Sequence, residues 1–95
     1  MTTATFEHND TTFTVEFNGE ANTAPPMWSA TVGYPSVEDG GPDLSAVPSS
    51  EAYPTAAIEA FVSEHVGRRV EFADCTGSGA DAGVWESWRF RPVSV

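Results

Sequence analysis

The sequence contains no lysine and a single cysteine, Cys75. One cysteine cannot form an intramolecular disulfide, which excludes a small secreted fold held together by disulfides and favours a reducing compartment. The first residues contain neither a basic nor a strongly apolar stretch, and no apolar run approaches the roughly 20 residues that a membrane span requires. We therefore expect a cytoplasmic protein that does not enter a membrane.

Positive charge is scarce, because 4 arginines face 14 acidic residues and leave a formal net charge of −10. The imbalance lies in residues 1–67, which contain no lysine or arginine, whereas residues 68–95 contain all the arginines. A negative field of this kind repels nucleic acid and anionic membranes and accelerates the encounter with basic surfaces. We expect no direct binding to nucleic acid or to membranes, and we predict that the partner is a basic protein surface.

Bulky apolar residues, in contrast, are plentiful. Hydrophobic residues make up 40% of the chain and aromatic residues 12%, which is enough to build a core without a metal ion or a disulfide. A chain of 95 residues holds material for one such core and not for two. We therefore predict a folded single domain.

Apolar and polar residues alternate over three stretches in the first third of the chain. Residues 3–8 and 12–18 alternate on either side of residues 9–10, which predicts a β-hairpin with a tight turn. Residues 18–19 are typical of a second turn, and residues 27–34 alternate again and predict a third strand. The inward residues of the second and third strands are Phe13, Val15, Phe17, Trp28, Ala30, Val32 and Tyr34.

Residues 55–66 change to the period of a helix, because apolar side chains recur at i, i+3, i+4, i+7 and i+8. Thr55 is in position to cap the start of this helix, and Gly67 is typical of a residue that ends one. Glu64 precedes Arg68 at the i, i+4 spacing, which predicts a weak ion pair if the helix extends that far. The apolar stripe consists of Ile58, Phe61, Val62, His65 and Val66. The outward face carries Glu59, Ser63 and Glu64.

Two further strands are predicted after the helix, at residues 69–74 and 84–90. The glycine-rich stretch 75–83 between them is predicted to be a flexible connection. The element order is therefore β-β-β-α-β-β, an α+β fold in which an antiparallel sheet of about five strands carries one helix on one face, and residues 1–95 form one such domain. The inward residues of the last two strands are Val70, Phe72, Trp88 and Phe90.

Residues 35–54 are predicted to form a long acidic loop. This stretch holds four of the seven prolines and no cation. A structureless loop of about 20 residues is unusual in a compact domain, so we expect it to be functional or partly ordered on the surface. Its carboxylates are Glu38, Asp39, Asp43 and Glu51.

Residues that carry chemistry are few and lack the spacing of a catalytic or metal site. Cys75 would need a base, and only His8 and His65 are available, of which His65 falls on the helix stripe where a packed histidine is common. One cysteine and two distant histidines do not match a zinc site. Residues 76–80 resemble a phosphate-binding loop, but acidic residues flank them and a strand follows, so we interpret them as a connection between strands. We predict no enzyme, no cofactor and no metal site.

Alternation places Trp85, Arg89 and Arg91 on the face of the last strand opposite Trp88. Tryptophan and arginine dominate the energetically important contacts of protein interfaces. Two interpretations stay open. Either both faces of the sheet are covered and every tryptophan belongs to the core, or Trp85 is exposed and forms an apolar anchor beside the two arginines, as a second contact surface or a homodimer seam.

We predict that the acidic residues bind a partner, because carboxylates spread over a rigid sheet and helix imitate the phosphates of nucleic acid and fit a basic groove. A short acidic α+β chain without an active site is similar in composition to small phage-encoded inhibitors of host defence, including DNA-mimicking anti-CRISPR and anti-restriction proteins. The similarity implies an inhibitor that occupies a nucleic-acid-binding surface of another protein. The predicted partner-binding residues are Glu7, Glu16, Glu38, Asp39, Asp43, Glu51, Glu59, Glu64 and Trp85.

Two other functions stay open. An acidic, lysine-free sequence is also typical of an accessory or structural domain from a salt-adapted proteome, with no specific partner. A small enzyme or ligand-binding domain that uses His65 and Cys75 is the third hypothesis. A requirement for molar salt in folding would favour the second hypothesis. Replacement of Cys75 with serine without loss of activity would remove the third.

Overall fold

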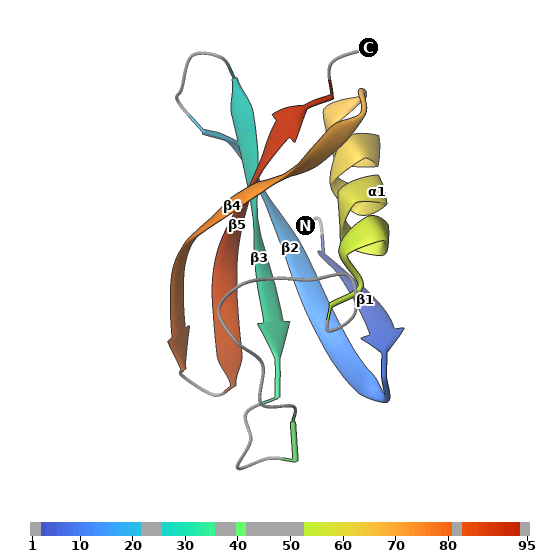
Figure 1. Cartoon of the computed structure of the whole chain (residues 1–95), viewed down its shortest axis with the longest axis vertical. Coiled ribbons are helices and arrows are strands. Elements are labelled where there is room, and N and C mark those ends of the chain that lie inside the picture. The colour runs from blue at the N-terminus through green and yellow to red at the C-terminus, as the bar shows by residue number, and fades with distance from the viewer. Residues whose placement is uncertain (1–2, 22–25, 36–39, 42–52, 81–82, 94–95) are drawn as a thin grey trace.

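The computed structural model describes residues 3–21, 26–35, 40–41, 53–80 and 83–93. Its elements are β1 (Thr3–His8), β2 (Thr11–Ala21), β3 (Met27–Tyr34), α1 (Thr55–Val66), β4 (Val70–Ala80) and β5 (Val84–Pro92). The strands form one antiparallel sheet with the order β1-β2-β3-β5-β4, and α1 covers one side of it (Figure 1). The predicted α+β fold with the element order β-β-β-α-β-β is therefore confirmed.

A tight turn joins β1 to β2, as predicted. Asn9 and Asp10 have φ angles of 51° and 63°, in the left-handed region that short polar side chains tolerate and that a two-residue hairpin turn requires. The pairing continues without a shift along the whole of β1. Alternation then directs Phe13 and Val15, which are both fully buried, toward the core.

The predicted second turn at Asn18 and Gly19 is wrong, because β2 continues through it to Ala21. Gly19 has a φ of 106° and absorbs a bulge in the pairing of β2 with β3. The side-chain amide of Asn18 donates to Thr31 Oγ1 across the two strands at 2.8 Å. The two residues therefore serve a bulged strand and not a chain reversal.

The prediction of a flexible connection over residues 75–83 is wrong for most of its length, because β4 continues to Ala80. Gly79 lies opposite Trp85 in β5. A Cβ atom at Gly79 would stand 2.7 Å from the indole ring of Trp85, so the glycine lets this large ring pack onto the edge strand. A stretch with the composition of a loop thus forms a strand, with two pairing irregularities that bend it.

The helix α1 spans the residues predicted for it and ends as predicted. Gly67 has a φ of 87°, and its N–H donates to the Ser63 carbonyl at 2.9 Å. The predicted cap at Thr55 is wrong, because Thr55 is already helical and Pro54 holds the capping position without a side-chain hydrogen bond. The chain enters the helix through a turn in which the Thr55 N–H donates to the Tyr53 carbonyl at 2.8 Å.

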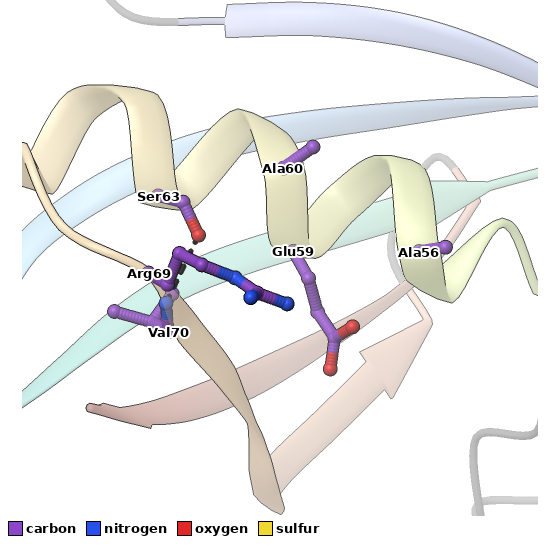
Figure 2. Close-up of a pocket in the computed structure, with 6 residues that line it drawn as sticks. All are labelled: Ala56, Glu59, Ala60, Ser63, Arg69 and Val70. Atoms are coloured by element: carbon purple, nitrogen blue, oxygen red, sulfur yellow. Dashed lines mark hydrogen bonds between the residues drawn. The ribbon is translucent and has the colours of Figure 1, made fainter. Parts of the chain in front are cut away.

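Two side chains of α1 bind the backbone of the edge strand β4. The Val70 N–H donates to Ser63 Oγ at 3.0 Å (Figure 2). The Phe72 N–H donates to Glu59 Oε2 at 2.7 Å. Free N–H groups on an edge strand are a template for pairing with other chains, and these two bonds occupy part of that edge. The prediction that Glu59 and Ser63 face outward is therefore wrong.

Glu64, the remaining residue of the predicted outward face, is exposed. Its expected ion pair with Arg68 is not among the ion pairs of the described residues, because α1 ends at Val66 and Arg68 lies beyond the turn at Gly67. Arg68 and Arg69 are both exposed just past the C-terminal end of α1, where the partial negative charge of the helix favours a cation.

The core lies between α1 and the inner face of the sheet. It contains most of the predicted inward residues and one that was not predicted, Tyr53, which precedes α1 and has no solvent exposure. Phe17, Trp28, Phe61, Val66 and Phe72 surround it and are partly buried. The buried apolar residues are Phe13, Val15, Ala30, Val32, Tyr34, Tyr53, Ile58, Val62, Val70, Trp88 and Phe90.

Candidate functional site

The side of the sheet that faces away from α1 is the candidate site, and we refer to it as the outer face. Alternation along each strand and the register between strands place the same kind of residue on this side across the sheet: short hydroxyl side chains, several charged groups and one tryptophan. Most of these side chains are exposed or half-exposed. The described side chains of the outer face include Thr3, Thr5, Glu7, Thr12, Thr14, Glu16, Asn18, Ser29, Thr31, Glu71, Asp74, Trp85, Ser87, Arg89 and Arg91.

Both arginines of the outer face are neutralised by carboxylates of the neighbouring strand. Arg89 binds Asp74 through two hydrogen bonds, from Nε at 2.7 Å and from Nη2 at 2.5 Å. Arg91 Nε donates to Glu71 Oε2 at 2.6 Å. These pairs are set by the register of β4 on β5. The arginines therefore leave the carboxylates of β1 and β2 without a compensating charge.

Glu7 and Glu16 are the outer-face carboxylates without an ion pair among the described residues. Both are exposed, and Glu7 has only a long contact of 3.5 Å from the Thr12 hydroxyl. Glu7 lies opposite Thr12, so Glu16 stands roughly 13 Å farther along the hairpin. The outer face is therefore negative on the side of β1 and β2 and close to neutral on the side of β4 and β5.

The structure divides the predicted partner-binding residues between two sides of the molecule. Glu7, Glu16 and Trp85 share the outer face. Glu59 and Glu64 lie on α1, which covers the opposite side, and Glu59 is engaged with β4. The other predicted residues, Glu38, Asp39, Asp43 and Glu51, lie outside the described residues.

Trp85 is the largest hydrophobic side chain exposed among the described residues, with 40% of its surface accessible. The interpretation that every tryptophan is a core residue is therefore wrong, although Trp88 is fully buried. Trp85 pairs with Gly33 in β3 on one side and with Gly79 in β4 on the other. The indole ring lies against Gly79, and both residues that pair with Trp85 across the sheet are glycines.

A buried carboxylate on the inner face was missed in the sequence analysis. Glu86 of β5 is 2% exposed and accepts hydrogen bonds from Tyr53 Oη at 2.7 Å, from Tyr34 Oη at 3.0 Å and from Trp88 Nε1 at 3.0 Å. Desolvation by burial raises the pKa of both Tyr34 and Tyr53, so both hydroxyls keep their protons at neutral pH. The alternation of the strand could have predicted this position, because Glu86 is two residues from Trp88 and therefore faces the same side of the sheet.

The Glu86 cluster is complete within itself. Among the described residues no buried side-chain nitrogen or oxygen lacks a hydrogen-bond partner. Tyr34 ends β3 and Tyr53 precedes α1, and their hydroxyls are 3.3 Å apart. A closed network of this kind fixes the ends of two elements and leaves no group free for a ligand, which indicates a structural role.

His65 and Cys75 do not form a site together. His65 Nδ1 lies 2.9 Å from the Phe61 carbonyl on α1, and its ring stacks on Phe17. Cys75 lies on β4, where desolvation by burial raises the pKa of its thiol, which opposes the thiolate form that a nucleophile needs. No group of three or more potential metal ligands occurs in the part of the chain that the structure describes.

A shallow pocket of about 400 Å³ lies between α1 and the start of β4 (Figure 2). Glu59 and Ser63 in its lining are already engaged by the backbone of β4. The pocket is therefore a consequence of how the helix covers the edge strand. Its lining residues are Ala56, Glu59, Ala60, Ser63, Arg69 and Val70.

The ion pair between Arg89 and Asp74 makes a pH-dependent prediction. The Arg89 guanidinium holds the pKa of Asp74 below its ordinary value in the folded state. The contribution of the pair to stability is therefore present above the pKa of the unfolded state, about 4, and is lost as the pH falls through the lower folded-state value. We expect Asp74→Asn to be less stable than the parent at neutral pH, by a difference that shrinks as the pH falls below about 4. Urea unfolding at a series of pH values measures this difference, and a difference that does not shrink with acidification would contradict the assignment.

A helix of the length and apolarity needed to cross a membrane is absent from the described residues. Comparison of the chain with protein-family models, with curated proteins and with solved structures found no match.

Proposed function

We propose that this protein is a binding protein that docks the outer face of its sheet onto a basic surface of another protein, of the kind that otherwise holds nucleic acid. The observation that supports this most is the separation of charge on the outer face. Arg89 and Arg91 are paired with carboxylates of β4, whereas Glu7 and Glu16 are exposed and have no ion pair among the described residues. A surface of unpaired carboxylates attracts a partner that offers unpaired cations.

The scaffold beneath these carboxylates is suited to recognition. Glu7 and Glu16 project from a regular hairpin whose other side is packed in the core through Phe13 and Val15. Their spacing therefore varies little, so that little ordering entropy is lost on binding. Trp85 adds an exposed aromatic group to the same face, and tryptophan is among the side chains that contribute most at interfaces.

A protein that occupies such a basic surface competes with nucleic acid for it. In this proposal the chain acts as an inhibitor by imitation of nucleic acid, as do the phage-encoded inhibitors to which it is similar in composition. The proposal assigns the recognition to the outer face and not to α1, because Glu64 is distant from the outer-face carboxylates and Glu59 serves the fold.

Charge reversal on the outer face tests the proposed function. We expect Glu7→Lys/Glu16→Lys to lose at least about tenfold in affinity for a basic, nucleic-acid-binding partner, because two attractions become repulsions. The matched control is Glu20→Lys/Glu64→Lys, which changes the net charge equally. Both of its residues are exposed, Glu64 lies on α1, and Glu20 pairs with Trp28 on the α1 side of the sheet.

The measurement begins with capture on immobilised chain from a nuclease-treated bacterial lysate at about 0.05 M and about 0.5 M salt, since salt screens exposed charges. Each captured protein is then purified and tested for displacement from the chain by duplex DNA. The proposal would be supported by a partner that is captured at low salt, is displaced by duplex DNA, and is no longer captured by Glu7→Lys/Glu16→Lys but is still captured by the control variant. Equal loss in the two variants would show a general effect of net charge, and no displacement by DNA would refute the nucleic-acid-like mode.

A further inference from the structure

The exposed indole ring of Trp85 is not explained by the fold. A tryptophan on a solvent-facing strand position costs the protein solubility, and 40% of this side chain stays accessible. The core contacts of β5 are made by Trp88 and Phe90, which are fully buried on the other side of the strand. Trp85 therefore contributes little to the core, and its surroundings decide what else it does.

The described neighbours of Trp85 across the sheet and along its strand are small residues. Three ring atoms, Cε2, Cζ2 and Nε1, lie within 2.8 Å of where a Cβ of Gly79 would be, so the ring rests on the backbone of β4. Across the sheet its other neighbour is Gly33, and Ser87 is the next outer-face residue along β5. Glycine and serine are too short to cover an indole ring. The result is an aromatic ring that packs against Gly79 and keeps 40% of its surface accessible to a partner.

The charges on the outer face determine which kind of chemical group binds the indole ring of Trp85. The face of an indole ring carries partial negative charge and attracts cations. Arg89, the nearest arginine on the same strand face, is held by Asp74 through two hydrogen bonds, and Arg91 is held by Glu71, so both arginines of the outer face are already paired. Glu7 and Glu16 add negative charge to the same side of the sheet, with no ion pair to the part of the chain that the structure describes. A nucleobase would bring phosphates into this field, and an uncharged ring would gain nothing from it.

We propose that Trp85 is the binding site for an arginine side chain of the basic partner, whose guanidinium group lies flat on the exposed part of the indole ring. Arginine binds an indole ring better than lysine does. Its planar, weakly hydrated guanidinium stacks on aromatic rings, whereas the ammonium group of lysine stays strongly hydrated. This inference rests on the proposed function, since it names the side chain that the outer face receives.

Matched peptides test the site. The probes are a nine-residue peptide that alternates arginine and glycine, the same peptide with lysine, and the same peptide with citrulline, which keeps the planar shape but carries no charge. The readout is the NMR signal of the Trp85 indole N–H during titration, with the buried Trp88 indole N–H as an internal control, because that group donates to Glu86. We expect the arginine peptide to shift the Trp85 signal at a concentration about three- to tenfold lower than the lysine peptide, and the citrulline peptide to have little effect.

Two variants separate the site from general acidity. Trp85→Leu should weaken binding of the arginine peptide and abolish its advantage over lysine, while Glu64→Gln should change neither. Gly79→Ala should also weaken binding of the arginine peptide, although it keeps the indole ring. The added methyl group would displace the ring of Trp85 from its position against β4. Folding of each variant is checked by the position of the Trp88 signal.

The outcomes distinguish this inference from the proposed function. If Trp85→Leu binds the arginine peptide as tightly as the parent while Glu7→Gln/Glu16→Gln loses it, the acidic face binds cations and the arginine site is refuted. If neither variant changes binding, both proposals fail. An equal response to citrulline would identify a plain apolar contact, and concentration-dependent self-association lost in Trp85→Leu would identify a second copy of the chain as the occupant. Either of these results would overturn the inference.

Discussion

Replacement of Glu86 with alanine is expected to destabilise the fold by about 3–5 kcal/mol. The carboxylate of Glu86 accepts hydrogen bonds from two tyrosine hydroxyls and one indole N–H in an environment where the side chain is 2% exposed. Its removal leaves three buried donors without their acceptor and opens a cavity, and each orphaned donor costs about 1–3 kcal/mol. The full sum is not reached, because the hydroxyls of Tyr34 and Tyr53 are 3.3 Å apart and can bond to each other.

Urea unfolding of Glu86→Ala and of Glu86→Gln measures this effect. Glutamine has nearly the same shape and keeps one acceptor oxygen. Its NH2 group, however, would face the tyrosine hydroxyls or the indole N–H, which are hydrogen-bond donors themselves. We therefore expect about half of the loss in unfolding free energy that alanine causes. Glu64→Ala serves as the control, since Glu64 is exposed, and its unfolding free energy should change by less than about 0.5 kcal/mol. If Glu86→Ala were as stable as Glu64→Ala, the network would not be part of what holds the fold.

Tyr53→Ala is expected to cost about 3–5 kcal/mol, although Tyr53 lies outside any helix or strand. Its ring has no solvent exposure and packs against Phe13, Tyr34 and Trp88, with ring centroids 5.4–5.8 Å away. Its hydroxyl binds Glu86 at 2.7 Å. The residue lies just before Pro54, the capping residue of α1, so its loss weakens the attachment of the start of the helix to the sheet.

Tyr53→Phe divides this effect into its parts. Phenylalanine keeps the ring but removes one of the donors to Glu86, so we expect a loss of about 1–2 kcal/mol from the hydrogen bond alone. Thermal or urea unfolding of the two variants gives both values. A loss in Tyr53→Phe as large as that in Tyr53→Ala would show that the hydroxyl and not the ring supplies the stability.

The positions of the elements were predictable where a single local rule applied. Alternation located β1 and β3 to the residue, and the apolar stripe with Gly67 located α1. The rule failed where glycine was read as a signal for a turn. Gly19 lies in a bulge of β2, and Gly79 leaves space on β4 for the ring of Trp85. In both cases the glycine is required by the pairing or packing of a neighbouring strand. Information of that kind is not local, because it depends on which strands become neighbours.

The candidate site shows the same division between local and distant information. Composition predicted that residues 1–67 carry the uncompensated charge, and alternation placed Glu7 and Glu16 on an outward face. That Arg89 would be neutralised by Asp74 depends on the register of β4 against β5, which includes a shift next to Asp74. The engagement of Glu59 by the backbone of Phe72 depends on how α1 crosses the sheet. Neither contact has a signature within its own segment.

The proposed function requires the outer face to be the surface that contacts a basic partner. The most direct test is a map of backbone amide shifts on addition of the arginine-glycine peptide, recorded at about 0.05 M and about 0.5 M salt. We predict that the shifts concentrate at Glu7, Glu16 and Trp85, with little change along α1, and that they disappear at the higher salt. Shifts that cluster on α1, or that persist unchanged at the higher salt, would contradict it.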